Sequence, residues 1–318
     1  ITFNLANACL VIDEADFYDD FTQANILVLL EALKEWSVPV LLMSASLPES
    51  VLADYQKIGH SVTSILEDTS DSDRDRFKIN AIEDYSSVLE LDSILKKCIE
   101  AGSAIIYANT VDKAIKFHQY FEYRNIEAIL YHSRFTEPHK KDKEELLIKH
   151  LGREAWETER AKGIAILTQI GEMSINISAD IMVSDLCPID RLTQRAGRLC
   201  RFDNQKVGEL YVIVPHKEDK VYPPPYGDYN KKEKRWVPVE AFEKTRKALK
   251  LESYNPKKLV SLLNSIYSIN KKFSPVSLDN AKRLKDSFRC NWLINPMYRT
   301  ELDDNDTTQW KSRNIDPQ

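Results

Sequence analysis

Seven apolar runs of strand length recur along this sequence, and amphipathic patterns with helical spacing separate most of them. The runs are ACLVI (8–12), PVLLMS (39–44), SAIIYAN (103–109), EAILYH (127–132), GIAIL (163–167), DIMVS (180–184) and ELYVIV (209–214). Continuous apolar runs of this length are typical of strands buried on both faces. Strands that alternate with helices predict an α/β fold, in which a parallel sheet is covered by helices.

The alternation is interrupted twice, which divides the chain into four predicted segments. Residues 1–60 hold only two convincing strands and cannot close a sheet by themselves, and residues 61–76 form a linker that ends in EDTSDSDRDR. Residues 77–217 hold enough strands for a complete α/β domain. Residues 218–318 begin with the Pro/Tyr-rich run VYPPPYGDY and continue with helical patterns. We expect this last segment to be an accessory domain.

Composition excludes several classes of protein. The sequence has 318 residues, of which 43% are apolar and 29% are charged, as in ordinary globular proteins. It contains no run of about 18 apolar residues and no signal peptide, so no membrane segment is predicted. Its five cysteines are scattered without C-x-x-C spacing, which indicates neither a zinc site nor a disulfide framework. A reducing cytoplasm is the expected location.

Basic residues are concentrated near the carboxyl end, although the net charge is −5. Residues 230–290 contain 16 Lys/Arg against 6 Asp/Glu. Such a cluster is a plausible contact surface for a polyanion. The solvated faces of amphipathic helices would give the same pattern, so both interpretations stay open.

Two short motifs follow the first two predicted strands. In CLVIDEAD (9–16), carboxylates come directly after an apolar run, where open α/β sheets place their ligand sites. Asp13 is suited to hold Mg²⁺ and Glu14 to polarise a water that attacks a phosphate. In LLMSASLPE (41–49), the hydroxyls of Ser44 and Ser46 could relay between two sites. Either motif alone is weak, because acidic and hydroxyl residues are also common in solvated loops.

A third motif, PIDRLTQRAGRLCR (188–201), is more specific. If the whole segment is helical, Gln194, Arg198 and Arg201 share one face and Arg195 points about 100° away. Arginines on one face with few acidic neighbours favour an anionic ligand, such as a phosphoryl group in transfer. A solvated basic helix is the alternative.

In this order the three motifs resemble motifs II, III and VI of superfamily-two helicases, which are motors with two RecA-like domains. Longer stretches are similar to the CRISPR-associated helicase-nuclease of type I interference systems. They are IIYANTVDKAIKFHQYF (105–121), LYHSRFTEPHKKDKE (130–144) and LTQIGEMSINISADIMVSDLCPIDRLTQRAGRLCR (167–201). The resemblance covers about residues 8–215.

The resemblance implies ATP and Mg²⁺ as cofactors and single-stranded DNA as a partner. Asp13 and Glu14 would hold Mg²⁺ and activate water, and Arg198 and Arg201 would reach the nucleotide from the second domain. The other implied contacts are Gln194 to the nucleotide or motif II, Asp16, Asn176 and Arg195 to the nucleotide, Ser44 and Ser46 in coupling, and Thr110, Arg134 and Thr168 to DNA phosphates. For Arg134 and Thr168, a helix cap or a strand-end hydrogen bond explains the residue equally well.

The sequence departs from the family in three places. Asn176 stands where an aspartate is usual, which could slow ATP turnover. No G-x-x-x-x-G-K-[ST] loop for ATP phosphates and no His-Asp dipeptide of the nuclease domain occurs in the chain. We therefore expect the missing helicase half and nuclease in the same or a partner polypeptide, and we expect this chain alone to be inactive.

The sequence thus favours part of an ATP-dependent translocase that follows single-stranded DNA and acts with an RNA-guided CRISPR interference complex. Two alternatives stay open. One is another superfamily-two motor, such as an RNA helicase or a restriction translocase. The other is a nucleotide-independent module that binds nucleic acid or a protein partner.

Overall fold

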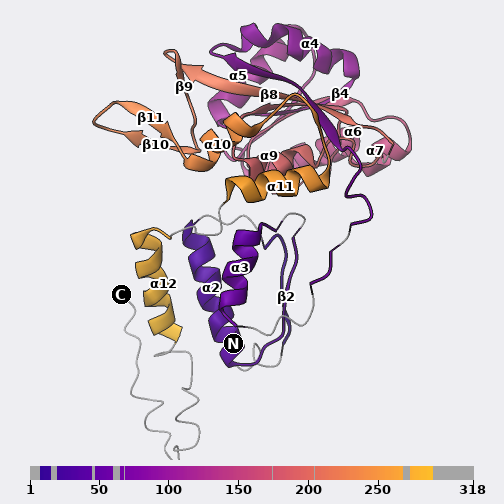
Figure 1. The fold of residues 1–318 in the computed structure, drawn as a ribbon. Coiled ribbons are helices and arrows are strands. Elements are labelled where there is room, and N and C mark those ends of the chain that lie inside the picture. Colours follow the sequence, from indigo (N-terminus) through magenta and orange to yellow (C-terminus); the bar gives the residue numbers. More distant parts are fainter. Residues whose placement is uncertain are drawn as a thin grey trace, which may run out of the picture. The chain divides into compact units, whose positions relative to one another are not determined.

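The computed structural model describes residues 8–15, 20–44, 47–59, 65–67, 69–173, 175–203, 205–267 and 273–288. The chain divides into two compact units (Figure 1). One unit comprises residues 1–66 together with 267–318, and the other comprises residues 67–266.

The larger unit is built on an eight-stranded sheet, which is mainly parallel. Along the sheet the strands follow the order β12, β3, β8, β7, β4, β6, β5, and β9 pairs with β8. Six of them are parallel: β3 (Phe77–Tyr85), β4 (Ser103–Tyr107), β5 (Ile129–Tyr131), β6 (Gly163–Leu167), β7 (Ile181–Asp185) and β8 (Gly208–Lys217). The short strands β9 (Lys220–Val221) and β12 (Ser253–Tyr254) are antiparallel to their neighbours. This arrangement confirms the predicted α/β fold with a parallel, helix-covered sheet.

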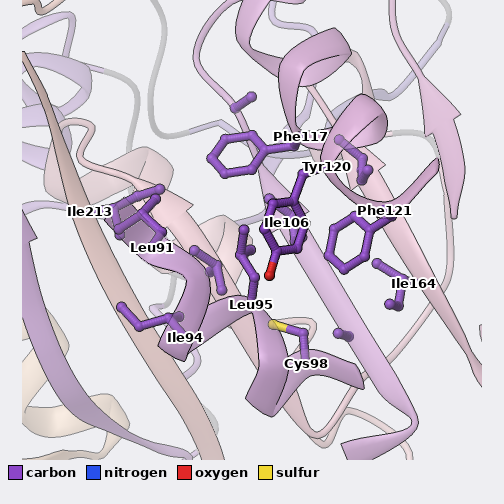
Figure 2. Close-up of a cluster of buried hydrophobic side chains, with 14 of the residues drawn as sticks. Leu91, Ile94, Leu95, Cys98, Ile106, Phe117, Tyr120, Phe121, Ile164 and Ile213 are labelled. Carbon is purple, nitrogen blue, oxygen red and sulfur yellow. The ribbon is translucent and has the colours of Figure 1, made fainter. Parts of the chain in front are cut away.

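Helices cover both faces of this sheet (Figure 1). The helical elements are η1 (Val88–Leu91), α4 (Asp92–Ala101), α5 (Val111–Glu122), α6 (Glu137–Leu151), α7 (Arg153–Glu157), α8 (Ile170–Met173), α9 (Ile189–Ala196), α10 (Glu240–Ala248) and α11 (Pro256–Ile266). Helices α4 and α5 pack on one face, where Ile94, Leu95 and Phe117 meet Ile106 and Ile213 of the strands (Figure 2). Because both faces are covered, β4 and β7 are buried at every residue, which explains their apolar sequences. None of the helices among the described residues has the length and apolar character needed to cross a membrane.

The boundary that the sequence predicts at residue 217 differs from the observed division. Residues 218–266 belong to the same compact unit as the sheet. Strand β12 pairs with the edge strand β3, and Phe242 of α10 is completely buried. The Ile189 backbone N–H also donates to Thr245 Oγ1 at 2.9 Å. These contacts explain why the segment packs on the sheet domain instead of forming a separate appendage.

The smaller unit contains β1 (Leu10–Ile12), α2 (Asp20–Glu35), β2 (Val40–Leu42), α3 (Glu49–Lys57) and α12 (Pro275–Ser287). Strands β1 and β2 are parallel, and Val11 lies opposite Leu41. A small core of buried residues that includes Leu30, Leu33 and Tyr55 packs beside them. Val11 and Leu41 are about half exposed, at 53% and 49%, so one face of this two-stranded sheet is open.

Candidate functional site

The acidic motif and the serine motif lie side by side in the smaller unit. Asp13 follows β1, and Met43 and Ser44 follow the parallel neighbour β2. Hydrogen bonds from Ala15 N to Met43 O and from Met43 N to Ile12 O, both 2.9 Å, hold the two strand ends together. Two other predicted residues, Asp16 and Ser46, lie outside the described residues.

The carboxylates of this motif face solvent. Asp13 and Glu14 are both exposed. One oxygen of Asp13 accepts a hydrogen bond from the Glu14 backbone N–H at 2.9 Å, and Glu14 has a φ of 53°. This left-handed conformation is uncommon for a residue with a side chain and sharply turns the chain at the end of the strand. An exposed carboxylate at a strand end is chemically suited to hold Mg²⁺, which prefers oxygen ligands.

Three predicted phosphate contacts follow adjacent strands of the larger unit. Thr110 comes after β4, Arg134 after β5 and Thr168 after β6. Because these strands are parallel neighbours, their carboxyl ends meet at one edge of the sheet. The structure therefore brings the three residues to the same edge, although they are far apart in sequence.

Each of these three residues also has a local structural role. Thr110 caps α5 and its Oγ1 accepts from Lys113 N at 3.4 Å. Arg134 is exposed and pairs with Asp112 at 3.0 Å. Thr168 is buried, and its backbone N–H donates to Tyr131 O at 3.3 Å. Arg134 thus has the side chain best placed to reach a ligand outside the protein.

The arginine motif does not form one continuous helix. Helix α9 ends at Ala196, and Gly197 is its C-cap. The condition under which Gln194, Arg198 and Arg201 would share one face is therefore not met, because the last two residues lie beyond the helix. Gln194 is half-buried and accepts from Arg191 Nη1 at 3.4 Å, whereas Arg201 is exposed and its backbone N–H donates to Ser178 Oγ at 2.9 Å.

Arg198 is buried instead of facing a ligand. Its side chain is only 4% exposed, and its guanidinium donates to the backbone carbonyls of Glu172 and Ile175. These carbonyls belong to the segment that connects β6 to β7. Arg198 therefore fastens this connection to the end of the arginine motif. Asn176, in the same connection, is exposed.

Arg195 is completely buried at the centre of a polar network. Its Nε donates to Glu172 Oε1 at 2.7 Å, and its Nη1 donates to Ser184 Oγ at 3.0 Å and to Asp185 O at 3.1 Å. Its Nη2 donates to Asn109 Oδ1 at 3.1 Å and to Tyr226 Oη at 3.4 Å. A guanidinium has five N–H donors, and all of them have protein acceptors here. This placement does not support the direct nucleotide contact expected of Arg195.

The network lies where β4 and β7 are neighbours and their connections leave in opposite directions. From β4 the chain continues to β5, which lies beyond β6 on one side of β4. From β7 it continues to β8, which lies on the opposite side. Such a switch point at the carboxyl ends of parallel strands is the usual place for a ligand site in an open α/β sheet.

Sequence reasoning does not identify five members of this network. Asn109, Glu172, Ser184 and Asp185 lie inside the helicase-like stretches 105–121 and 167–201, but the motifs indicate no role for them. Tyr226 lies in the Pro/Tyr-rich run, which predicts only a turn. A polar residue directly after a buried strand is the one signal that could have indicated Asn109, which follows the apolar part of SAIIYAN.

Asp185 joins this network to a second buried group. Its carboxylate accepts from Tyr85 Oη at 2.6 Å and from the Asn109 backbone N–H at 2.7 Å. Lys113 Nζ lies 3.8 Å from the same carboxylate. Burial lowers the pKa of Lys113, and Asp185 opposes that shift. Burial, together with Asp185, raises the pKa of Tyr85, so its hydroxyl stays protonated as a donor.

Replacing Tyr85 with phenylalanine is expected to lower the free energy of unfolding by about 1.5–3 kcal/mol, the range for a hydrogen bond to a charged group. The change removes the donor at 2.6 Å and leaves the ring in the core. Urea unfolding measures the loss. The control is Tyr123→Phe, because Tyr123 is 84% exposed. Equal stability of the two variants would show that the Tyr85 hydroxyl does not stabilise Asp185.

Comparison with known proteins finds similarity to one family. The family described as CRISPR-associated nuclease/helicase Cas3, C-terminal, matches residues 100–204. A putative Cas3 nuclease/helicase of Methanocaldococcus jannaschii is 29% identical over 229 residues, which are 67% of this chain and 30% of that protein. The corresponding protein of Myxococcus xanthus is 34% identical over 202 residues, 62% of this chain and 26% of that protein. The chain thus spans less than a third of the length of either relative.

Solved structures show the same fold. The crystal structure of T. fusca Cas3 has a TM-score of 0.68 and 20% identity, and the match covers 90% of this chain and 38% of that one. The structures of T. fusca Cas3 with ADP and with ATP have TM-scores of 0.66. A chain of a CRISPR RNA-guided surveillance complex in a pre-nicking state has a TM-score of 0.65. Residues 100–204 therefore match the carboxyl-terminal Cas3 family, and the chain is similar in sequence to Cas3 nuclease/helicases and shares the fold of the T. fusca protein.

Proposed function

We propose that this chain contributes the carboxyl-terminal part of an ATP-dependent translocase that moves along single-stranded DNA in type I CRISPR interference, an antiviral defence. The observation that carries the proposal is the match to Cas3 relatives combined with the placement of the motif residues at strand carboxyl ends. The other superfamily-two motors are not favoured, because the curated relatives are Cas3 proteins.

The acidic motif that follows β1 would act on the nucleotide and its metal ion. Asp13 would hold Mg²⁺, Glu14 would orient the attacking water, and Asp16 would contact the nucleotide. The exposure of the Asp13 carboxylate at the end of β1 supports this role, because a metal ion can reach its oxygens from solvent. When bound, Mg²⁺ neutralises the charge that develops on the phosphates. Ser44 lies beside this motif, and Ser44 with Ser46 would couple nucleotide state to DNA binding.

In the second unit we assign the phosphate-stabilising role first to Arg201, whose side chain is exposed. Gln194 and Asn176 would contact the nucleotide, since both are at least partly accessible. Arg195 and Arg198 would act as positioning residues, because their guanidinium groups donate to protein acceptors. For Arg198 to reach a phosphate as the resemblance implies, its hydrogen bonds to the carbonyls of Glu172 and Ile175 would have to open.

Thr110, Arg134 and Thr168 would contact the phosphates of one DNA strand. Their location at one edge of a parallel sheet supports this role, because a row of strand ends can follow a nucleic-acid backbone. Backbone contacts suffice for a motor whose target is chosen by the base pairing of a guide RNA. The RNA-guided complex is therefore the proposed partner, the nuclease would lie elsewhere in the same or a partner chain, and the cytoplasm is the proposed location.

The proposal predicts ATP hydrolysis that depends on single-stranded DNA. In a whole helicase that contains this chain and a phosphate-binding loop, single-stranded DNA should stimulate phosphate release, and RNA of the same length should not. The 318-residue chain alone should release no phosphate above background, because it has no G-x-x-x-x-G-K-[ST] loop. Stimulation by RNA in preference to DNA would contradict the proposed substrate, and hydrolysis by the chain alone would show that it does not need this loop.

A further inference from the structure

A two-stranded hairpin extends from the larger unit outside its eight-stranded sheet. Strands β10 (Gly227–Asn230) and β11 (Arg235–Pro238) pair antiparallel, and Figure 1 shows them extending away from the sheet. The four-residue turn is ordered by Asn230 Oδ1, which accepts from the backbone N–H groups of Lys232 at 3.0 Å and Glu233 at 3.2 Å. The sequence pattern predicts only turns in this region, because the strands are short and mostly polar.

One face of this hairpin carries aromatic side chains. Tyr229 lies directly opposite Trp236, and their ring centroids are 5.6 Å apart at an interplanar angle of 62°. Residues that lie opposite each other in an antiparallel pair project from the same face. Tyr222 also packs against Trp236, with centroids 6.1 Å apart. Tyr229 is 48% exposed, so the aromatic face is open to solvent at this residue.

The turn of the hairpin is basic. The stretch 227–238 contains four Lys/Arg against two Asp/Glu. Lys231, Lys232 and Lys234 are all exposed, whereas Arg235 pairs with Glu233. The lysine charges of the turn therefore face solvent, close in sequence to Tyr229 and Trp236.

The base of the hairpin is attached to the buried network. Tyr226 immediately precedes β10, and its hydroxyl accepts from Arg195 Nη2 at 3.4 Å. The Val239 backbone N–H donates to Tyr226 O at 3.0 Å and closes the base of the hairpin. Lys113 Nζ lies 5.3 Å from the Tyr222 ring centroid and 3.8 Å from the Asp185 carboxylate. The hairpin is thus anchored to the residues that surround the arginine motif.

We propose that the hairpin 227–238 binds single-stranded nucleic acid, with bases stacked on Tyr229 and Trp236 and phosphates beside Lys231, Lys232 and Lys234. Exposed aromatic rings with cations beside them are the physical basis of sequence-independent single-strand binding. The inference rests on the proposed function and deepens it, because it adds a contact site outside the motif residues. The contacts of its base with Arg195 and Lys113 would hold this site in a fixed position relative to the carboxyl ends of β4, β5 and β6.

The test measures fluorescence anisotropy of labelled oligo-dT and oligo-rU with the 318-residue chain and its variants. Tyr229→Ala and Trp236→Ala should each weaken binding about tenfold, and Tyr229→Phe and Trp236→Phe should restore most of the affinity because the ring is kept. The aromatic control is Tyr123→Ala, which removes an exposed ring elsewhere. Circular dichroism checks that each variant is folded.

A second measurement tests the lysines. In Lys231→Gln/Lys232→Gln, the slope of log K against log salt should become shallower by about 0.7 for each phosphate that the chain no longer neutralises. The matched control is Lys149→Gln/Lys162→Gln, because both residues are exposed and lie near the amino end of β6, at the opposite edge of the sheet. Tighter binding of oligo-dT than of oligo-rU by the wild-type chain would identify DNA as the bound strand, and the reverse would identify RNA.

The outcomes separate this inference from the proposed function. If Arg134→Ala weakens binding and the hairpin variants bind like the wild type, the hairpin proposal is wrong and the proposed function stands. If the wild-type chain binds neither oligonucleotide, the proposed strand contacts of this chain and the hairpin site are both wrong. An equal decrease of affinity in the hairpin and control variants would also overturn the hairpin site. The affinity would then depend on the number of lysines or aromatic rings in the whole chain and not on their position in the hairpin.

Discussion

Replacing Arg195 with alanine is expected to lower the free energy of unfolding of the larger unit by about 3–5 kcal/mol, the cost of breaking a buried ion pair by removing one partner. Arg195 and Glu172 have side chains that are 0% and 1% exposed, with Nε 2.7 Å from Oε1. The substitution removes the nearer cation of the buried Glu172 carboxylate and leaves only the Arg191 guanidinium, 3.9 Å from Oε2. It also removes the donors to Asn109 Oδ1 and Ser184 Oγ, although Ser184 Oγ keeps its own hydrogen bond to Asp185 O at 2.9 Å.

Urea unfolding followed by circular dichroism measures this loss, and the matched control is Arg153→Ala. Arg153 also pairs with a glutamate, Glu157, at 3.6 Å, but its side chain is 66% exposed. Exposed pairs contribute only about 0–1 kcal/mol, so the control should be nearly as stable as the wild type. A destabilisation below about 1 kcal/mol for Arg195→Ala would mean that the buried pair does not hold the unit together.

A double variant separates the ion pair from the rest of the network. Arg195→Met with Glu172→Leu removes both charges and fills the site with apolar side chains of similar volume. Replacing both members of a buried pair is often neutral or stabilising, whereas removing one is costly. We expect the double variant to be more stable than Arg195→Ala. It should nevertheless lose the fixed position of Tyr226, whose hydroxyl would no longer receive the Arg195 donor.

The strands that carry the motifs could be predicted because their sequences are continuously apolar. Strand β6 has the bounds that the run GIAIL predicts, and β4 begins at the predicted residue. Residues that follow parallel strands must meet at one edge of the sheet, so the gathering of Thr110, Arg134 and Thr168 could also be predicted. Strand β3 could not be predicted in this way. Its sequence mixes charged and apolar residues, and the pairing with β8 makes it a strand.

The roles of the arginines could not be predicted from spacing. Helical periodicity assumes that a helix continues, but α9 ends at Ala196, and the chain then turns back toward β8. Burial of Arg195 depends on acceptors from distant segments, including Asn109 and Tyr226. No local pattern specifies such partners, since they meet only through the order of the strands in the sheet.

Replacing Arg201 with alanine is expected to reduce DNA-stimulated ATP turnover of a whole helicase by about a thousandfold, the lower range for an arginine that stabilises a transferring phosphoryl group. Folding stability should change little, because the Arg201 side chain is exposed and contacts of exposed charges contribute only about 0–1 kcal/mol. Arg201→Lys should recover only part of the turnover, since an ammonium keeps the charge but lacks the planar, bidentate fork. Steady-state phosphate release and a thermal unfolding curve measure the two effects.

Arg198→Ala is the matched comparison for Arg201→Ala, because it replaces the buried arginine of the same motif. Arg198 donates to the carbonyls of Glu172 and Ile175, so its replacement should lower stability and disturb the connection from β6 to β7. The two arginines, three residues apart, should therefore separate a loss of catalysis from a loss of folding. If Arg201→Ala keeps normal turnover while Arg198→Ala loses turnover and stays fully stable, the assignment must be reversed. In that case the Arg198 guanidinium would have to leave its two carbonyls during the reaction cycle and reach the nucleotide.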